Sequence, residues 1–351
     1  MIKIGSKTIS EKSPVFIVAE AGVNHNGNLK LAKKLIDVAV LAGVDAVKFQ
    51  TFNPDTLVAK NVSKADYQAK NEKRLKKEES QYEMLKRLML PREWHKELKK
   101  YAESKGLIFL STPFSLDDAV FLRKLGVKAI KVGSTDTENL PYLAKIAKWN
   151  LPIILSTGMS ALPEIKEAVR TIQKAGNDKL IVLHCTTNYP TPFEEVNLRA
   201  IATLQRELKN IPIGFSEHTV GIEATVASVA LGARVIEKHF TLDKNFPGPD
   251  HSASLEPDEL KQLVSSVRRI ETAMGTGNKV LFVSEKKIAE VARKSLVVAR
   301  DIPSGKQLTA EDVSVKRPGT GIKPKFLNKI IGKTAKVNLQ KDQLLSWDLI
   351  K

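Results

Sequence analysis

The segment IPIGFSEHT, residues 211–219, is an apolar stretch that ends in four polar side chains. A second segment of the same design, RVIEKHF at residues 234–240, carries Glu237, Lys238 and His239 before its last residue, Phe240. Near-continuous apolar runs are typical of parallel strands that are covered on both faces. Two neighbouring strands that end in His218 and His239 therefore indicate a functional site at that end of a parallel sheet.

Similar apolar segments occur on both sides of this pair and alternate with segments of helical periodicity. Residues 29–43 are one such helical segment, and Gly43 is expected to cap the helix. This alternation predicts a parallel α/β fold. Eight repeats in about 240 residues predict a (β/α)8 TIM barrel. The predicted strands are residues 15–22, 46–50, 108–113, 129–134, 152–158, 180–186, 211–219 and 234–240.

Two departures from the regular repeat define the remaining organisation. Residues 53–105 contain a charged, helix-prone insertion, which on the catalytic face of a barrel often acts as a lid or an interface. After about residue 275 the sequence changes to short strand-like pieces separated by Pro and Gly turns. We therefore expect a barrel domain at 1–275, a linker at 276–293 and a small, mostly β domain at 294–351.

Composition narrows the class of protein. The net charge of +17 favours an anionic substrate over nucleic acid, because the lysines are interleaved with glutamates and no zinc-finger or aromatic-basic repeat is present. No apolar run is long enough for a membrane span, and the N-terminal segment lacks the apolar core of a secretory signal. The single cysteine, Cys185, excludes an internal disulfide, and we expect a cytoplasmic protein.

All eight predicted strands end in polar residues, at the end where TIM barrels place their active sites. Single members have structural interpretations: His184 is better explained as a hydrogen-bonded core histidine, and Cys185 as a small buried hydrophobe. The set as a whole predicts an active site. Its members are Glu20, Asn24, His25, Lys48, Gln50, Ser111, Thr112, Lys131, Ser134, Ser156, His184, Thr187, Asn188, Tyr189, Ser216, Glu217, His218, Glu237 and His239.

These residue types indicate particular chemistry. Lysines among Ser and Thr hydroxyls suit a phosphate or a carboxylate. His218 and His239 on adjacent strands suit a shared divalent ion such as Mn²⁺, with an unmetallated hydrogen-bonded pair as the alternative. Glu20 and Glu237 suit proton transfer or binding of substrate hydroxyls. The rigid loop FPGPDHSAS, residues 246–254, would present Asp250 to a substrate.

The motifs AEAGVNHNG, VKFQTF, STPF, KVGS, LSTGM, HCTTNYPTP, GFSEHT, EKHFTLD and GPDHSAS together resemble the sialic acid synthases, within the wider group of nonulosonate synthases. The segment that begins SLVVARDIPSGKQLTAEDV resembles the C-terminal antifreeze-like (SAF) domain of those enzymes. The resemblance extends over nearly the whole chain.

The resemblance implies that phosphoenolpyruvate, an open-chain N-acylated hexosamine and water yield a nonulosonate and phosphate. With N-acetylmannosamine the product is N-acetylneuraminate; a 2,4-diacetamido-trideoxy hexose giving legionaminate or pseudaminate is the alternative. A divalent metal, Mn²⁺ or Mg²⁺, would polarise the aldehyde oxygen.

Residue roles follow from the same resemblance. His218 and His239 would bind the metal, and Glu20 and Glu237 would lie near the reacting carbons. The family forms domain-swapped homodimers, in which Arg317 would reach the N-acyl group of the sugar in the partner's barrel. At position 187, two residues before Tyr189, this sequence has Thr where some sialic acid synthases have Asn. The difference affects one phosphoenolpyruvate contact. The other phosphoenolpyruvate contacts would be Lys48, Thr112, Lys131, Ser134, Ser156 and Ser216, and the sugar contacts Gln50, Tyr189 and Asp250.

Two other classes compete with this hypothesis. A barrel that condenses phosphoenolpyruvate with a sugar phosphate would need arginines for a second phosphate, and no predicted strand ends in one. A non-catalytic glycan- or ice-binding protein would not need polar residues at every strand end. Both classes are therefore less favoured than a nonulosonate synthase.

Overall fold

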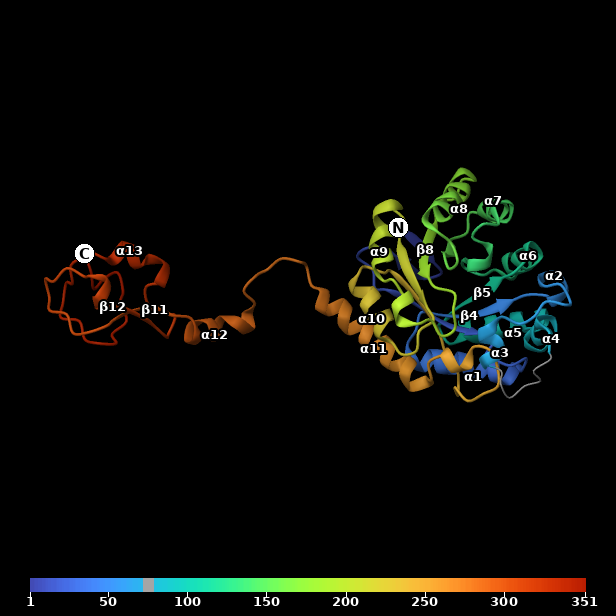
Figure 1. The fold of residues 1–351 in the computed structure, drawn as a ribbon, viewed down its shortest axis with the longest axis horizontal. Coiled ribbons are helices and arrows are strands. Elements are labelled where there is room, and N and C mark those ends of the chain that lie inside the picture. Colours follow the sequence, from blue (N-terminus) through green and yellow to red (C-terminus); the bar gives the residue numbers. More distant parts are fainter. Residues whose placement is uncertain (72–78) are drawn as a thin grey trace. The chain divides into compact units, whose positions relative to one another are not determined.

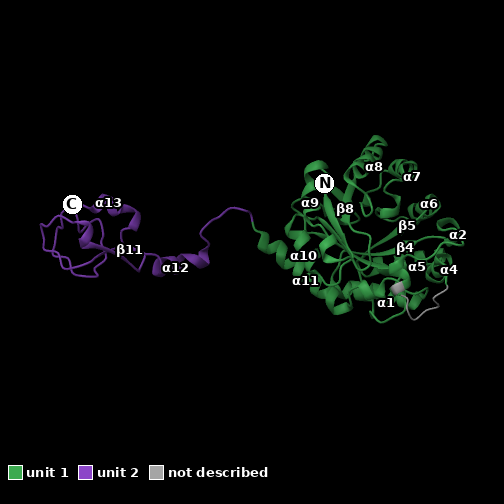
Figure 2. Cartoon of the chain, viewed as in Figure 1, with its two compact units in different colours: residues 1–275 green, residues 276–351 purple. Residues whose placement is uncertain are grey.

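The computed structural model describes residues 1–71 and 79–351. The chain divides into two compact units, Met1–Gly275 and Thr276–Lys351 (Figure 2). No helix among the described residues is long and apolar enough to cross a membrane.

The first unit is the predicted parallel barrel (Figure 1). Its hydrogen-bonded strand order is β5-β4-β3-β10-β9-β8-β7-β6, and β5 and β6 lie next to each other at the two ends of this order. The sheet is therefore nearly closed. The strands are β3 (Phe16–Gly22), β4 (Ala46–Thr51), β5 (Ile108–Pro113), β6 (Ile130–Val132), β7 (Ile153–Ser156), β8 (Leu180–Cys185), β9 (Ile213–Glu217) and β10 (Val235–His239).

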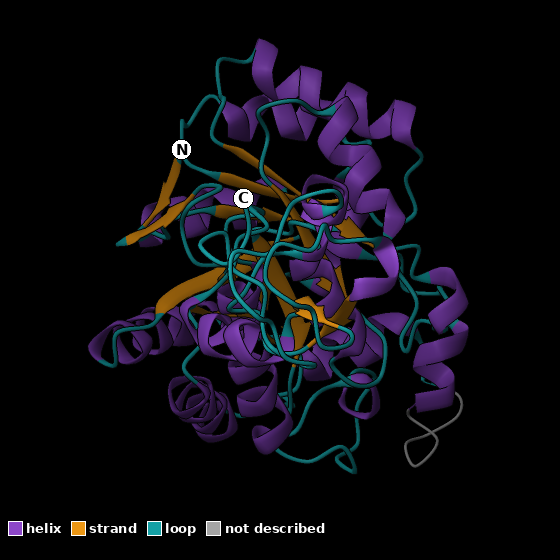
Figure 3. Cartoon of the chain, turned by 90° about the vertical axis from the view of Figure 1, so that its left-hand side faces the viewer, coloured by secondary structure: helices purple, strands orange, loops and turns teal. Residues whose placement is uncertain are grey.

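Each barrel strand leads to a helix, and the helices surround the strands (Figure 3). The first of them begins at Asn28, whose side chain accepts from two backbone N–H groups, and ends at Gly43 in the left-handed conformation, as predicted. The helices are α1 (Leu29–Ala42), α5 (Arg92–Ser104), α6 (Leu116–Leu125), α7 (Leu140–Ala147), α8 (Leu162–Lys174), α9 (Arg199–Glu207), α10 (Glu223–Ala230) and α11 (Pro257–Met274).

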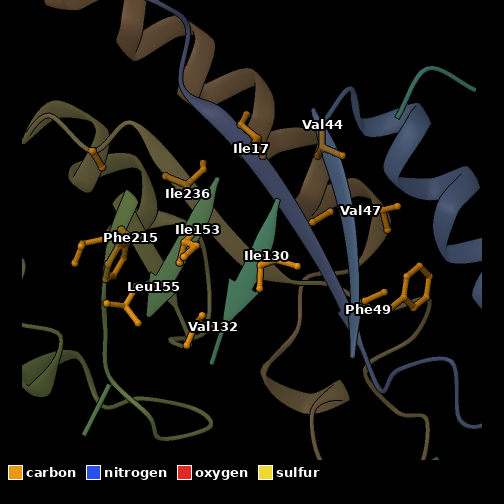
Figure 4. Packing of buried hydrophobic residues seen from close by; sticks show 14 of the residues in the cluster. Ile17, Val44, Val47, Phe49, Ile130, Val132, Ile153, Leu155, Phe215 and Ile236 are labelled. Atoms are coloured by element: carbon orange, nitrogen blue, oxygen red, sulfur yellow. The ribbon is translucent and has the colours of Figure 1, made fainter. Parts of the chain in front are cut away.

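Two apolar cores lie on either side of the sheet. Outward-facing residues such as Ile17, Val47 and Ile236 pack between strands and helices (Figure 4). Inward-facing residues such as Phe16 and Val235 pack inside the barrel together with the hairpin β1 (Ile2–Ile4) and β2 (Lys7–Ile9), to which the sequence analysis assigned no structure. The hairpin supplies three isoleucines that help to fill the barrel interior.

The inward positions change character along each strand. Side chains alternate between the two faces of a strand, so every second residue points into the barrel. On β3 the inward Phe16 and Val18 are followed by Glu20, and on β10 the inward Val235 is followed by Glu237. An apolar barrel interior therefore gives way to polar side chains at the carboxyl ends of the strands.

The insertion after β4 contains several helices joined by irregular segments, in line with the helix-prone insertion predicted for residues 53–105, and residues 72–78 of that prediction lie outside the described residues. It contains α2 (Pro54–Leu57), α3 (Asp66–Asn71) and α4 (Gln81–Leu88). Met84 and Leu88 of α4 form a small apolar cluster with Val23 and Phe52 of the barrel. This cluster holds α4 over the carboxyl ends of the strands.

The second unit has antiparallel strands and its own apolar core. Strand β11 (Ser295–Val298) pairs with β12 (Val313–Lys316), and single bridges such as Ile302 with Leu339 connect the remaining extended segments. The unit also contains α12 (Val283–Ala292) and α13 (Leu327–Ile330), and short 3₁₀ turns occur in both units: η1 (Ser134–Asp136), η2 (Phe193–Glu195), η3 (His251–Ala253), η4 (Ala310–Asp312) and η5 (Pro324–Phe326).

Candidate active site

A cavity of about 450 Å³ opens at the carboxyl ends of the barrel strands, and all eight strands or the turns that follow them contribute to its lining. The structure brings into this one lining every barrel residue to which the resemblance assigned a role, whereas Arg317 lies in the second unit. The predicted residues in the lining are Glu20, Lys48, Gln50, Thr112, Lys131, Ser134, Ser156, Thr187, Tyr189, Ser216, His218, Glu237, His239 and Asp250.

Four buried charges form the floor of the cavity. Lys48 Nζ lies 2.8 Å from a Glu20 carboxylate oxygen and 3.6 Å from a Glu237 oxygen. Lys131 Nζ lies 3.6 Å from the other Glu237 oxygen. Because alternate residues face inward, β3, β4, β6 and β10 each contribute one of these side chains. Buried charges are tolerated when they are paired, so the four residues stabilise one another.

Hydroxyl groups complete the hydrogen bonding of the floor. Lys48 donates to Thr112 Oγ1 at 3.0 Å, and Lys131 donates to Ser156 Oγ at 2.7 Å. Ser216 donates to a Glu237 oxygen at 3.1 Å. The lysine ammonium groups are therefore held in fixed positions, from which they can also bind an anion that enters the cavity.

The two carboxylates of the floor differ in proton affinity. Burial raises the pKa of Glu20 to about 7, although Lys48 opposes the rise. Burial also raises the pKa of Glu237, but Lys131 and Lys48 outweigh that effect and lower it overall. Glu237 is therefore a permanent anion, whereas Glu20 can take up or release a proton near neutral pH.

The pKa values of the two lysines of the floor shift in opposite directions. Burial lowers the pKa of Lys131, and the attraction of Glu237 only partly compensates. Burial acts in the same way on Lys48, but Glu20 and Glu237 together raise its pKa. Lys48 is therefore the more firmly charged of the two.

On another side of the cavity, His218 and His239 face each other with ring centroids 5.4 Å apart. His218 Nδ1 donates to the Thr186 carbonyl oxygen at 2.7 Å, which leaves the lone pair of Nε2 available. His239 Nδ1 is buried, has no hydrogen-bond partner among the described residues, and lies 3.7 Å from Asp250 Oδ2. Two nitrogen lone pairs held close together suit a divalent cation.

Burial also keeps both rings neutral, as metal binding requires. It lowers the pKa of His218 to about 4 and lowers the pKa of His239 well below its ordinary value. Within the described residues, no group of three His, Cys, Asp or Glu side chains is arranged to hold a metal. The two imidazole donors therefore leave the remaining ligand positions of a bound divalent ion to water or substrate oxygens.

Gly158 lies close to two side chains that line the cavity, Ser134 and Thr187. Its N–H donates to Ser134 Oγ at 3.0 Å. A Cβ at this position would lie 2.0 Å from Thr187 Oγ1 and 2.8 Å from Ser134 Oγ. Thr187 Oγ1 is itself buried without a hydrogen-bond partner among the described residues, so it can bind a ligand in the cavity.

Gly158→Ala is expected to lower kcat/KM for phosphoenolpyruvate, the substrate that the resemblance implies, by about tenfold to a hundredfold, because overpacking costs about 1–3 kcal/mol and here displaces Thr187 and Ser134. Steady-state kinetics of phosphate release measures the loss. Gly133→Ala is the matched control: its Cβ would meet only ordinary van der Waals contacts at 3.6 Å and beyond. Equal losses in the two variants would show that the close approach at Gly158 is unimportant.

Six of the polar residues named at strand ends do not line the cavity: Asn24, His25, Ser111, His184, Asn188 and Glu217. This corrects the sequence analysis for all of them except His184, which was predicted to be a hydrogen-bonded core residue. The alternation of side chains is the physical reason for three of them. Ser111 bonds Thr51 at 2.6 Å, Glu217 pairs with Lys238 at 3.4 Å, and His184 bonds the Val196 carbonyl at 2.8 Å, the core role predicted for it.

Sequence reasoning missed the contribution of the insertion to the lining. Tyr67 and Gln68 of α3, and Gln81 and Leu85 of α4, face the cavity. The amphipathic pattern of QYEMLKRLML predicted a helix but gave no signal of which barrel residues its apolar face would meet. The resulting apolar side of the cavity consists of Val23, Phe52, Leu57, Met84, Leu85, Leu88 and Phe114.

Two protein-family models match most of the chain. The NeuB family model matches residues 35–279, and the SAF domain model matches residues 293–351. The chain belongs to the NeuB family. It is therefore an enzyme, a phosphoenolpyruvate-dependent synthase, which confirms the predicted family and reaction type. The predicted architecture, a barrel followed by an SAF domain, is also confirmed.

Individual members of the NeuB family resemble the chain over almost its full length. An N,N'-diacetyllegionaminic acid synthase of Legionella pneumophila is 46% identical over 99% of this chain and 98% of its own. One of Campylobacter jejuni is 48% identical over 94% and 98%. The crystal structure of an N-acetylneuraminic acid synthetase of Leptospira borgpetersenii, in complex with citrate, is 35% identical over 82% of this chain and 95% of its own, with a TM-score of 0.72.

Proposed function

We propose that this NeuB-family enzyme condenses phosphoenolpyruvate with the aldehyde of an open-chain N-acylated hexosamine and water, giving a nonulosonate and phosphate. The observation that carries the proposal is the juxtaposition in one cavity of two lysines, two carboxylates and two neutral histidines. An anion site, proton-transfer groups and a cation site are the three elements that such a condensation needs.

Phosphoenolpyruvate is assigned to the lysine side. Lys48 and Lys131 would neutralise its phosphate and carboxylate, and Thr187 would contribute its unpartnered hydroxyl. The remaining contacts of this group would be Thr112, Ser134, Ser156 and Ser216, which line the same cavity.

The sugar is assigned to the histidine side. His218 and His239 would hold Mn²⁺ or Mg²⁺, which when bound supplies Lewis-acid polarisation of the aldehyde carbonyl. The ring of Tyr189 lies with its centroid 4.0 Å from that of His218 and 5.4 Å from that of His239. Tyr189, Asp250 and Gln50 would orient the sugar chain between these groups and Glu20.

In the bond-making step, C3 of phosphoenolpyruvate forms a bond to the aldehyde carbon, and the aldehyde oxygen takes a proton. Water adds to C2, and its proton passes to a base before phosphate leaves with the bond electrons. Glu20 is the candidate for proton transfer because its pKa of about 7 suits both directions of transfer at neutral pH. Glu237, which stays ionised, would hold the two lysines in place.

The acceptor that we favour is a 2,4-diacetamido-trideoxy hexose, giving a legionaminate-type product. The two legionaminic acid synthases at 46% and 48% identity support it, and so does the apolar side of the cavity, which suits a methyl group and a second acetamido group. N-acetylmannosamine, giving N-acetylneuraminate, is the second candidate, supported by the likeness to the Leptospira enzyme.

Phosphate release with each sugar in turn, at saturating Mn²⁺ and phosphoenolpyruvate, tests this choice. The expected result is a kcat/KM at least tenfold higher for the diacetamido sugar. A preference for N-acetylmannosamine would mean that the product is N-acetylneuraminate, and the proposed condensation itself would stand. Absence of phosphate release with every acylated hexosamine would overturn the proposed function.

We further propose a domain-swapped homodimer in which Arg317 of one chain binds the N-acyl group of the sugar in the barrel of the other. Arg317→Ala should then raise the sugar KM by about tenfold or more, because hydrogen bonds to charged groups contribute about 1.5–3 kcal/mol, and leave the phosphoenolpyruvate KM nearly unchanged. Lys323→Ala, an exposed cation of the same unit, is the matched control. Equal damage to both substrates would mean that Arg317 acts through folding.

Mixing two impaired variants, assayed at a sugar concentration well below the wild-type KM, tests the swap itself. A heterodimer of Arg317→Ala and His239→Ala chains has one fully intact site only if each second unit serves the other barrel. Refolding equal amounts together should then restore about a quarter of wild-type activity, since half of the dimers are mixed and each has one intact site. No restoration would contradict the swap.

A further inference from the structure

Helix α3 of the insertion reaches two loops of the barrel with a single side chain. Asn71 Nδ2 donates to the Pro249 carbonyl oxygen at 2.7 Å and to the Tyr189 carbonyl oxygen at 3.2 Å. Tyr189 follows β8, and Pro249 follows β10. Both N–H groups of one amide therefore connect segments that are far apart in the sequence.

A second residue of α3 contacts the same place. The Tyr67 ring lies with its centroid 5.1 Å from that of Tyr189, at an interplanar angle of 31°. Tyr67 also lines the cavity. The pKa of Tyr67 is raised, mainly by burial and secondly by the negative charge of Asp250, so its hydroxyl stays protonated. Helix α3 is thus packed against the loops and does not merely lie near them.

Each loop also has an anchor of its own among the described residues. Thr191 N donates to the carbonyl oxygen of His218, the residue after β9, at 2.9 Å and so anchors the first loop. Ser254 Oγ donates to the Asp250 carbonyl oxygen at 2.7 Å, a contact within the second loop. Asn71 adds a direct connection between the loops, at the residue Tyr189 itself and at the residue before Asp250.

This connection lies next to the histidines. Tyr189 is in contact with His218, and Asp250 lies 3.7 Å from His239. A change in the separation of the loops would therefore change the position of the Tyr189 ring relative to the Asp250 carboxylate. Misplacement of binding groups by about 1 Å can cost about a hundredfold in rate, so a small shift here is costly.

We propose that Asn71 is a positioning residue, which fixes the separation of Tyr189 and Asp250 and so sets the affinity of the enzyme for the acylated hexosamine. The inference rests on the proposed function, because it takes Tyr189 and Asp250 as sugar contacts. It assigns to the insertion a role in sugar binding and none in binding phosphoenolpyruvate.

The first test compares Asn71→Ala and Asn71→Asp with wild type. Asn71→Asp keeps the shape but removes both donors and places a carboxylate against two carbonyl oxygens. We expect both variants to raise the sugar KM about tenfold to a hundredfold and to leave the phosphoenolpyruvate KM within about twofold. Asn61→Ala, an exposed asparagine of the same insertion, is the matched control and should behave as wild type.

An unchanged sugar KM, or an equal rise for both substrates, would overturn the proposal. Thermal unfolding of each variant shows whether the chain is folded. If Asn71→Ala unfolds, the same sugar and phosphoenolpyruvate KM values are measured for Tyr67→Leu, which removes the ring contact with Tyr189. The same outcomes then support or overturn the proposal. Activity of the wild-type enzyme is measured in parallel, so a failure of the proposed function appears there and is distinguishable from a failure of this inference.

A double-mutant cycle with Asp250→Ala separates positioning from direct contact. If Asn71 acts through Asp250, Asn71→Ala should raise the sugar KM by less than twofold in the Asp250→Ala background. Full additivity of the two effects would show that Asn71 acts independently of Asp250, and would overturn the positioning role.

Discussion

His239→Ala is expected to abolish turnover, with a loss in kcat of at least about a thousandfold, or about 4 kcal/mol at 1.36 kcal/mol per factor of ten. The substitution removes one of two neutral imidazoles whose ring centroids are 5.4 Å apart, and the described residues offer no third His, Cys, Asp or Glu in a metal-holding group. His218 alone would leave a divalent ion without a chelating pair.

Direct binding of Mn²⁺, measured by electron paramagnetic resonance or calorimetry, gives a readout that does not depend on turnover. Chelator-treated wild type should bind Mn²⁺ and regain activity, and chelator-treated His239→Ala should do neither. His184→Gln is the control, because His184 bonds a backbone carbonyl outside the cavity and should keep Mn²⁺ binding. Wild-type-like turnover of His239→Ala at saturating Mn²⁺ would contradict the metal assignment.

Lys131→Met should lower kcat/KM for phosphoenolpyruvate by at least about a thousandfold, again about 4 kcal/mol. The four-charge floor would lose one of its two cations, so that Glu20 and Glu237 face Lys48 alone. The resulting negative potential repels a polyanionic substrate, and the Ser156 hydroxyl loses its partner. Methionine keeps most of the side-chain volume, so packing is preserved.

The measurement is the phosphoenolpyruvate dependence of phosphate release, with calorimetric titration of phosphoenolpyruvate as a second readout. Lys128→Met removes an exposed lysine near the opposite end of the same strand and should change neither quantity. The sugar KM should change far less than that of phosphoenolpyruvate. A phosphoenolpyruvate affinity within a few-fold of wild type would show that Lys131 does not bind the anion.

Much of the barrel could be predicted because its signal is local. Parallel strands buried on both faces give unbroken apolar runs, and their polar ends mark the catalytic face. Within each end, the alternation of side chains decides which residue enters the cavity: Glu237 and His239 do, whereas Lys238 between them pairs with Glu217 behind the sheet. This alternation can be read from the sequence, and applying it would have excluded Glu217 and Ser111 from the predicted cavity lining.

Contacts between distant segments could not be predicted in the same way. The apolar face of α4 and the amide of Asn71 acquire their roles only when the insertion folds over the strand ends. The N-terminal hairpin β1–β2 fills the barrel interior with three isoleucines that have no distinguishing pattern in so short a segment. The choice of sugar depends on the same long-range contacts, which is why the motifs predicted the reaction and not the acceptor.

The most direct test of the central claim is the fate of oxygen when phosphoenolpyruvate reacts in ¹⁸O-water with Mn²⁺ and each acylated hexosamine. The account predicts that phosphate is released only when a sugar aldehyde is present, and that this phosphate is free of ¹⁸O because water adds to C2 and not to phosphorus. Phosphate that carries ¹⁸O, or that is released without any sugar, would show hydrolysis of phosphoenolpyruvate and would contradict the condensation.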